Sequence, residues 1–358
     1  MTQKDNLRFG VIGAGRIGKI HAENLATRIP GVQVAAIADV DLKAAQDLAA
    51  HTHVPLAVED YQAILSDPTI DAVAICSSTD THAKIVIEAA RAGKHIFCEK
   101  PIDLSLERID AALEAVEKAR VKLQIGFNRR FDPNFRKVRT MVAEGKIGTP
   151  QIIRITSRDP APPPLSYVKV SGGLFLDMTI HDFDMARYLS GSEVEEVYSA
   201  AAVMVEPAIG EAGDVDTAVI TLRFASGAIG TIDNSRKAVY GYDQRVEVFG
   251  SGGMVQAHNN TPDNDVYFNA DGVHSAKPLY FFLERYMESF IAEMKEFEQS
   301  IRENTSPPVT GIDGRIPVVM GMAAKKSNLE HRPVRLSEIT APLPNPAELI
   351  VPVNDRAV

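Results

Sequence analysis

The sequence predicts an α/β protein in two parts, an amino-terminal doubly wound parallel sheet and a second part built on a mostly antiparallel sheet. Three observations predict this fold. Up to residue 127, apolar runs alternate with helix-favouring segments, which is the pattern of parallel strands joined by crossover helices. After residue 190, strand-like runs follow one another with only turn signals between them. The chain of 358 residues also exceeds one typical domain.

The first part is expected to contain five strands separated by helices. The strands are expected at 9–12, 32–39, 69–78, 95–101 and 122–127. The helices are expected from residue 17 and at 41–51, 60–66, 82–92 and 106–120. We therefore place a dinucleotide-binding domain at residues 1–127.

The second part, residues 128–340, is expected to mix helices with an antiparallel sheet. Helices are expected at 132–144, 174–189 and 279–303, and the proline-rich stretch 160–173 is expected to be irregular. Strands are expected at 150–159 and within 194–205, 217–235, 243–257 and 264–274, where Ser-Gly, Gly-Ser-Gly-Gly and Asp-Gly turns separate the apolar runs. Residues 341–358 form a proline-rich tail.

A glycine motif ends the first strand. Gly13, Gly15 and Gly18 form G-x-G-x-x-G, in which the glycines allow a tight turn, a close approach of phosphate and close packing of helix on strand. The phosphate would sit on unpaired N–H groups at the positive end of the following helix. Asp39 ends the second strand, about 20 residues beyond the last glycine, where a carboxylate accepts hydrogen bonds from ribose hydroxyls. No arginine follows, so the motif indicates NAD rather than NADP.

Other residues follow the remaining strands and are expected beside the glycine motif, because ligands bind beyond the carboxyl ends of parallel strands. The expected cofactor-binding residues are Gly13, Gly15, Arg16, Ile17, Gly18, Asp39, Val40, Ser77, Ser78, Thr79, His82, Glu99 and Lys100.

Bulk properties restrict the partners. A net charge of −9 argues against a nucleic-acid partner. The sequence has no run of about 18 apolar residues, so no membrane-spanning helix is expected. The polar start leaves no space for a signal peptide. Cys76 and Cys98 are too few for a disulfide framework and are interpreted as packing residues, which favours a reducing cytoplasm. The nine histidines show no H-x-x-x-H pattern, so no metal is expected.

Three residues are candidates for catalysis. Asp177 and His181 are four apart on an expected helix, so a carboxylate could orient an imidazole that acts as general base. Lys100 follows the fourth expected strand, where its ammonium would stabilise a developing alkoxide. The structural alternatives are a solvated Asp–His pair and a surface lysine paired with Glu99.

Five blocks together resemble the glucose–fructose oxidoreductase and inositol dehydrogenase family, most closely its bacterial inositol 2-dehydrogenase branch. They are GAGRIG at 13–18, Asp39, EKP at 99–101, GFNRRFD at 126–132 and SGGLFLDMTIHDFDMARYL at 171–189. The segments 157–164 and 240–250 are similar to the substrate-side segments of that branch. The likeness covers nearly the whole chain except the tail.

The resemblance implies a Rossmann domain followed by an α+β domain whose large open sheet builds a homotetramer. It implies NAD as the cofactor, Lys100, Asp177 and His181 as the catalytic set, and further substrate contacts from Arg130, Asp159 and Tyr242. Met178 stands where some relatives are expected to carry a small polar residue, so the preferred polyol isomer stays open.

The implied reaction is NAD-dependent oxidation of a ring hydroxyl of a cyclic polyol, such as myo-inositol or scyllo-inositol, to a ketone. His181, oriented by Asp177, would remove the proton while Lys100 holds the oxygen, or the two residues exchange these roles. Three alternatives remain: a dehydrogenase of aldoses or other sugars, a glycosidase that recycles bound NAD, and a non-catalytic NAD-sensing protein.

Overall fold

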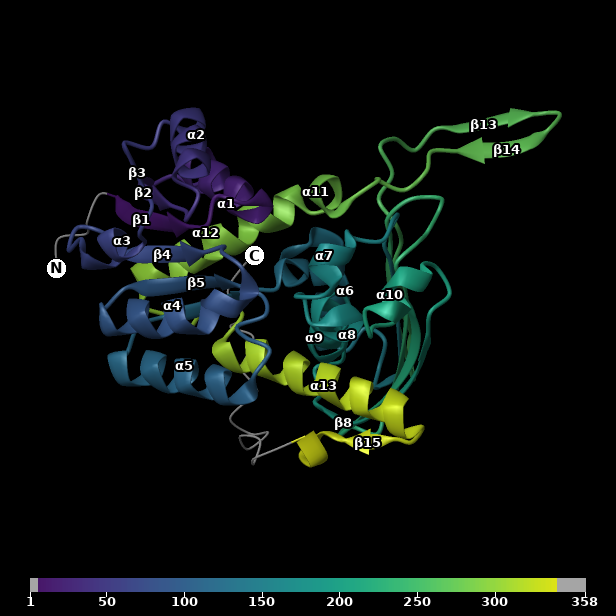
Figure 1. The fold of residues 1–358 in the computed structure, drawn as a ribbon. Coiled ribbons are helices and arrows are strands. Elements are labelled where there is room, and N and C mark those ends of the chain that lie inside the picture. The colour runs from purple at the N-terminus through teal and green to yellow at the C-terminus, as the bar shows by residue number, and fades with distance from the viewer. Residues whose placement is uncertain (1–5, 340–358) are drawn as a thin grey trace.

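The structure is a computed structural model that describes residues 6–339, and its two parts lie side by side (Figure 1). The first part is a six-stranded parallel sheet with the strand order β3-β2-β1-β4-β5-β6. Its strands are β1 (Leu7–Ile12), β2 (Val32–Ala38), β3 (Leu56–Val58), β4 (Ala72–Ile75), β5 (His95–Glu99) and β6 (Leu123–Gly126). The predicted doubly wound parallel sheet is confirmed.

Helices cover both faces of this sheet, because successive side chains of a strand point to opposite faces. The helices that follow the strands are α1 (Arg16–Thr27), α2 (Leu42–Thr52), α3 (Gln62–Ser66), α4 (Thr79–Arg91) and α5 (Leu106–Ala119). Val11 and Phe97 belong to the hydrophobic core under α1 and α2, whereas their neighbours Ile12 and Cys98 belong to the core under α4 and α5. Both cysteines are free and buried, as predicted for packing residues.

The sequence predicts five of the six strands. The missed strand, β3, has three residues and lies at the edge of the sheet, so it is too short to stand out as an apolar run. The fourth helix also begins earlier than expected, at Thr79 instead of residue 82, which brings Thr79 into the first turn of α4.

One helix from the second half of the chain completes the first part. The predicted helix 279–303 is two helices, α11 (Phe282–Arg285) and α12 (Met287–Glu303), interrupted at Tyr286. α12 packs on α1, and its Phe297 lies edge-on against Phe9 of β1 with a centroid distance of 6.1 Å. The parallel sheet therefore takes part of its core from residues near the carboxyl terminus.

The second part is a seven-stranded sheet with the order β12-β11-β7-β10-β9-β8-β15. Its strands are β7 (Pro150–Arg158), β8 (Val194–Ala202), β9 (Thr217–Phe224), β10 (Ile229–Ser235), β11 (Asp243–Gly250), β12 (Gly253–Ala257) and β15 (Val334–Arg335). Only the pair of β7 and β10 is parallel. The prediction of a large, mostly antiparallel sheet is confirmed.

Helices separate the two sheets and leave the outer face of the second sheet open (Figure 1). The shorter elements of this part are η1 (Asn128–Phe131), α6 (Pro133–Ala143), α7 (Leu165–Val168), α8 (Gly173–Asp177), α9 (Thr179–Ser190), α10 (Pro207–Glu211) and η2 (Leu336–Ile339). Along β9 the residues alternate, with Ala218 buried and Val219 55% exposed, so one face packs under helices and the other faces outward.

Two predictions about residues 160–189 are wrong in part. The stretch 160–173 is not wholly irregular, because α7 forms directly after its last proline, Pro164. The predicted helix 174–189 is divided into α8 and α9 at Met178, whose backbone angles are φ −95° and ψ −59°. The division rotates the residues after Met178 relative to those before it.

The sequence reading missed the longest helix, α13 (Gly311–Glu330), which spans the two parts of the molecule (Figure 1). Pro317 lies inside it, and buried residues surround most of its circumference, so it shows no amphipathic stripe. Its start is nevertheless well defined. The Thr310 hydroxyl accepts from the Asp313 N–H, and the Asp313 carboxylate accepts from the Thr310 N–H, forming a capping box.

A two-stranded hairpin, β13 (Val266–Asn269) and β14 (Gly272–Ser275), projects away from the second sheet (Figure 1). The proline-rich tail predicted for residues 341–358 lies outside the described residues. Within residues 6–339, no helix has both the length and the apolar character needed to span a bilayer.

Phe297→Ala is expected to lower the free energy of unfolding by about 3–5 kcal/mol, because its fully buried ring joins α12 to the parallel sheet. Urea denaturation measures the change. Leu329→Ala on α13 is the control, since this side chain is 69% exposed and its removal should change stability by less than about 0.5 kcal/mol. Equal effects of the two substitutions would contradict the packing described here.

Candidate active site

The glycine motif forms a tight turn between β1 and α1. Gly13 has φ +105°, and a side-chain carbon there would lie 2.6 Å from the backbone of Cys76. A side-chain carbon on Gly18 would lie 1.9 Å from the Gly13 carbonyl oxygen. Gly15 is the N-cap of α1, and a side-chain carbon on it would meet nothing within 4 Å. Two glycines thus close the turn, and the third leaves open space at the helix N-terminus, which fits a bound pyrophosphate.

Asp39 follows β2 beside this turn. Its carboxylate accepts hydrogen bonds from the Ala14 N–H at 2.6 Å and the Asp41 N–H at 2.9 Å. The next residue, Val40, is 88% exposed. The carboxylate therefore lies at the glycine turn with an open side next to it, as binding of a ribose requires. These residues fit the predicted cofactor.

The ends of β4 and β5 are tied together by His82. One ring nitrogen lies 2.8 Å from the Pro101 carbonyl oxygen and the other 3.0 Å from the Ser77 carbonyl oxygen. The side chain is buried, and the Ser77 hydroxyl bonds to that of Thr81 at 2.7 Å. His82 thus shapes the rim of the predicted cofactor site, while Ser78 and Thr79 begin α4 at its edge.

Lys100 follows β5, and the peptide bond to Pro101 is cis. The lysine ammonium donates to the backbone carbonyl of Asp177 at 2.8 Å and lies 3.5 Å from one carboxylate oxygen of the same residue. The two side chains are 16% and 11% exposed. The structure thus brings together two of the three predicted catalytic residues, one from each part of the molecule.

Asp177 has two further partners that the sequence did not indicate. The Tyr167 hydroxyl donates to its Oδ1 at 2.8 Å, and the Arg236 guanidinium donates to its Oδ2 at 3.0 Å. Burial opposes ionisation of the carboxyl group, but the charges of Lys100 and Arg236 outweigh it and lower the pKa of Asp177. Asp177 is therefore an ionised carboxylate at neutral pH.

Arg236 also reaches Asp159, which follows β7. The guanidinium lies 3.4 Å from the Asp159 carboxylate, and the arginine side chain is 3% exposed. Burial raises the pKa of Asp159 to about 6, against the lowering effect of Arg236. The order Asp159, Arg236, Asp177, Lys100 is thus a row of alternating charges, which we call the charge row.

His181 lies in the first turn of α9, with its ring edge-on to Phe127 at a centroid distance of 5.9 Å. Burial first, and then the positive charges of Lys100 and Arg129, hold its pKa well below the usual value. Its buried Nδ1 has no hydrogen-bond partner within residues 6–339. The imidazole is therefore neutral at physiological pH and able to accept a proton.

The predicted hydrogen bond between Asp177 and His181 does not form in this structure. The reason is the division of the helix at Met178, since residues four apart share a face only along one continuous helix. The Asp177 carboxylate is instead occupied by Lys100, Tyr167 and Arg236.

The predicted substrate residues Arg130 and Tyr242 lie in different surroundings. Arg130 makes a bidentate bond to Asp184 and a further bond to Asp313 at 2.9 Å, which ties η1 to α9 and α13. Tyr242 is 6% exposed, and the charges of Arg129 and Asp159 both act on its hydroxyl. Tyr242 is thus close to the charge row, whereas Arg130 is engaged by the buried Asp184 and by Asp313, whose side chain is 14% exposed.

The neighbouring Arg129 holds α9 in place. It forms an ion pair with Asp182 at 2.6 Å, and the other Asp182 oxygen accepts from the Asn234 side chain on β10 at 2.8 Å. All three side chains are buried. This contact fixes the turn of α9 that carries His181 against the second sheet.

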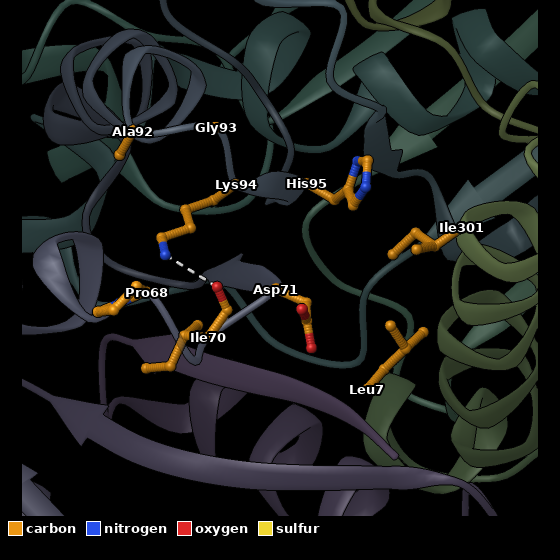
Figure 2. A pocket seen from close by; sticks show the side chains of 9 residues that line it. All are labelled: Leu7, Pro68, Ile70, Asp71, Ala92, Gly93, Lys94, His95 and Ile301. Carbon is orange, nitrogen blue, oxygen red and sulfur yellow. Dashed lines mark hydrogen bonds between the residues drawn. The ribbon is translucent and has the colours of Figure 1, made fainter. Parts of the chain in front are cut away.

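A cavity of about 390 Å³ lies away from all of these residues (Figure 2). Its walls include Leu7, Asp71 and His95, which stand at the amino ends of β1, β4 and β5, and the Lys94 ammonium donates to the Ile70 carbonyl oxygen at 2.8 Å. Ligands of doubly wound sheets bind at the carboxyl ends of the strands, so this cavity is not the cofactor site.

Comparison with known families shows which family this chain belongs to. Residues 7–127 match the oxidoreductase family with an NAD-binding Rossmann fold, and residues 135–256 match the GFO/IDH/MocA C-terminal domain. The chain belongs to the GFO/IDH/MocA oxidoreductase family. The predicted family and the predicted NAD cofactor are confirmed.

Several members of the GFO/IDH/MocA family are similar along nearly their whole length. The myo-inositol 2-dehydrogenase of Thermotoga maritima is 53% identical over 93% of this chain and 99% of its own. The inositol 2-dehydrogenase of Rhizobium meliloti is 45% identical over 92% of this chain and 99% of its own. The crystal structure of scyllo-inositol dehydrogenase from Lactobacillus casei with bound NAD(H) and scyllo-inositol has a TM-score of 0.87 and 31% identity, covering 93% of this chain and 99% of that one.

Sequence reasoning missed Tyr167 and Arg236. Tyr167 lies in the proline-rich stretch that we interpreted as irregular, and Arg236 follows β10 with no motif around it. Their only sequence signal is position: each follows a segment that ends near the site. Their role becomes visible only when the two sheets are placed together.

Asp39→Ala is expected to weaken NAD binding about 10-fold and to reduce the preference for NAD over NADP. The carboxylate holds the glycine turn through Ala14, accepts ribose hydroxyls and repels a 2′-phosphate. Calorimetric titration with both dinucleotides measures the change. Asp47→Ala on α2, where the side chain is 67% exposed, is the control and should leave both affinities unchanged. An unaltered NAD-to-NADP ratio in Asp39→Ala would reject this role.

Proposed function

We propose that this protein is an NAD-dependent dehydrogenase that oxidises a ring hydroxyl of inositol to a ketone. The proposal rests on one observation. Lys100, at the carboxyl edge of an NAD-binding sheet, contacts the segment that contains Asp177 and His181. Relatives of nearly the same length that are named myo-inositol 2-dehydrogenase and inositol 2-dehydrogenase support the substrate class.

Each side chain of this site has a separate role in the proposed reaction. NAD supplies the hydride acceptor. His181, whose imidazole is neutral, accepts the proton of the reacting hydroxyl. The Lys100 ammonium, held by the Asp177 carbonyl, donates a hydrogen bond to the same oxygen and stabilises the negative charge that develops on it.

The charge row fits a polyol. A cyclitol carries a hydroxyl on every ring carbon, and each hydroxyl both donates and accepts. The carboxylates of Asp159 and Asp177 accept hydrogen bonds, whereas Arg236 and Lys100 donate them. Together with the nearby Tyr242, this alternation would hold several hydroxyls while one faces His181.

We further propose that the protein is a homotetramer formed through the second sheet and works in a reducing cytoplasm. A row of apolar residues crosses the outer face in register: Ile229 opposes Ile152, Ile152 opposes Phe249, and Phe249 opposes Met254. Ile229, Phe249 and Met254 are 50%, 42% and 48% exposed. A contiguous apolar row of this kind is typical of a protein–protein interface.

Lys100→Met and His181→Ala are each expected to lower kcat for NAD-dependent inositol oxidation by at least about 100-fold, because each removes a group that acts on the reacting oxygen. NADH absorbance with myo-inositol, scyllo-inositol and aldoses measures both the rate and the preferred substrate. An unchanged rate in both variants would reject the catalytic assignment. A protein that binds NAD but forms no net NADH with any of these substrates would instead be a recycling or sensing relative.

The pH dependence of kcat/KM distinguishes the two possible proton acceptors. Because the pKa of His181 is lowered, activity that depends on neutral His181 should persist below about pH 6.5. An acidic limb that persists unchanged in the single-turnover pH profile of His181→Ala would instead exclude His181 as the proton acceptor. Asp159→Asn is the control for the carboxyl group whose pKa is about 6, since an acidic limb that stays in this variant does not belong to Asp159.

Phe249→Glu is expected to dissociate the tetramer, because it places a charge in the centre of the apolar row. Light scattering of the purified protein gives the mass of the assembly. Leu329→Glu introduces the same charge at an exposed position on α13 and should leave the mass unchanged. A wild-type protein that is monomeric at micromolar concentration would contradict the proposed assembly.

A further inference from the structure

A buried group of titratable residues lies where α1, β5 and α12 meet. It consists of His21, Glu99 and Glu293, which are 0%, 8% and 0% exposed. One ligand atom of each lies within 4.8 Å of the others. The phenyl rings of Phe97 and Phe290 stand edge-on to the imidazole, with centroid distances of 4.8 Å and 5.7 Å. The group is therefore enclosed by apolar walls.

Glu99 is the centre of the group. One of its carboxylate oxygens lies 2.7 Å from His21 Nε2, and the other accepts the backbone N–H of Lys100 at 3.3 Å. The backbone of β6 leaves space for this carboxylate only because residue 126 is glycine: a side-chain carbon there would lie 2.9 Å from Glu99 Oε2. Glu99 thus connects the main chain of Lys100 to the helix that follows the glycine turn.

Glu293 completes the group without a hydrogen bond of its own. Its Oε1 lies 3.9 Å from His21 Nε2, and both of its carboxyl oxygens are buried with no hydrogen-bond partner within the described residues. Burial and then the charge of Glu99 raise the pKa of Glu293 well above its usual value. Its other titratable neighbour, Cys76, also has a pKa raised by burial and by these two carboxyl groups. Both effects therefore favour the protonated, neutral form of the Glu293 carboxyl group.

The distances favour a shared proton over a metal ion. Two ligands bound to one tetrahedral zinc ion at about 2.1 Å are about 3.4 Å apart. His21 Nε2 and Glu99 Oε1 are 2.7 Å apart, which is the length of a charge-assisted hydrogen bond. Two carboxyl groups and one imidazole in an apolar enclosure also need an added proton to avoid an uncompensated charge.

We propose that Glu99 is a positioning residue for Lys100, and that His21 and Glu293 form with it a buried proton-sharing group that fixes Glu99. The inference rests on the proposed function, because it takes Lys100 as a residue that acts on substrate. The consequence is that Lys100 is held in position. The group joins the turn that carries Lys100 to α1, which holds the predicted pyrophosphate site, and to α12, so the lysine keeps a fixed place relative to the cofactor.

The first test measures whether Glu99 acts through Lys100. Glu99→Ala should lower kcat for inositol oxidation at least 10-fold with less than a threefold change in KM for NAD. Glu99→Gln, which keeps an acceptor for the Lys100 N–H, should recover most of kcat. The double variant His21→Phe/Glu99→Ala should be no slower than Glu99→Ala alone, because the two residues act as one unit. Equal kcat in the wild type and Glu99→Ala, or independent losses that multiply in the double variant, would overturn the proposal.

The second test measures the proton on Glu293 without using activity. The native state holds one proton more than the unfolded state between the unfolded pKa of about 4.3 and the raised native pKa, so stability falls as pH rises through this range. Glu293→Gln is neutral at every pH and removes this loss. Its Tm should match that of the wild type near pH 4.5 and exceed it increasingly towards neutral pH. A difference in Tm that does not depend on pH would overturn the proton-sharing assignment, and so would a stoichiometric transition metal in the purified protein.

The two proposals fail in different ways. If Lys100→Met retains full activity, the proposed function of Lys100 is wrong, whatever Glu99 does. If Lys100→Met is inactive while Glu99→Ala keeps its kcat, only the positioning role is wrong. Glu288→Ala is a matched control on the exposed side of α12 and should change neither kcat nor the pH dependence of Tm.

Discussion

The contact between the Lys100 ammonium and the Asp177 carbonyl is the interaction on which the rest of the site depends. It joins the end of β5 in the parallel sheet to the end of α8 in the second part. The glycine turn belongs to one part and His181 to the other, so the proposed proton acceptor comes close to the cofactor site only when the two parts pack together. The long α13 and the packing of α12 under the parallel sheet hold the two parts in this relation.

The charge row is stable because each of its members lies next to at least one opposite charge. Arg236 is almost fully buried, and isolated burial of a guanidinium would be strongly unfavourable, but Asp159 and Asp177 both compensate it. The same arrangement makes the row interdependent, since removing one charge leaves its neighbours uncompensated. Such a row resists rearrangement, and a rigid set of donors and acceptors is what the proposed recognition of a ring of hydroxyls would require.

Much of the fold and part of the site can be predicted from local sequence patterns. The glycine turn and Asp39 are visible because a few adjacent residues determine their geometry. The sequence does not predict α13, because Pro317 lies inside it and apolar residues occur on nearly all of its faces, so no helical period is visible. The break at Met178 is not predicted either, because nothing in the residues around it interrupts a helical pattern. Arg236 and Tyr167 could not be predicted, since their partner Asp177 is distant in sequence and approaches them only through the tertiary fold.

The low pKa of His181 also has a mechanistic meaning. Burial, and then the charges of Lys100 and Arg129, lower the pKa of His181, so its imidazole is neutral in the resting site. In the proposed reaction, a substrate hydroxyl that begins to ionise beside Lys100 would place negative charge next to that cation and offset its effect on the imidazole. Under the proposed mechanism, the basicity of His181 would therefore rise as the alkoxide develops, which would stabilise the transition state more than the bound alcohol. In the proposed reaction Asp177 would contribute by fixing Lys100, without accepting a hydrogen bond from His181.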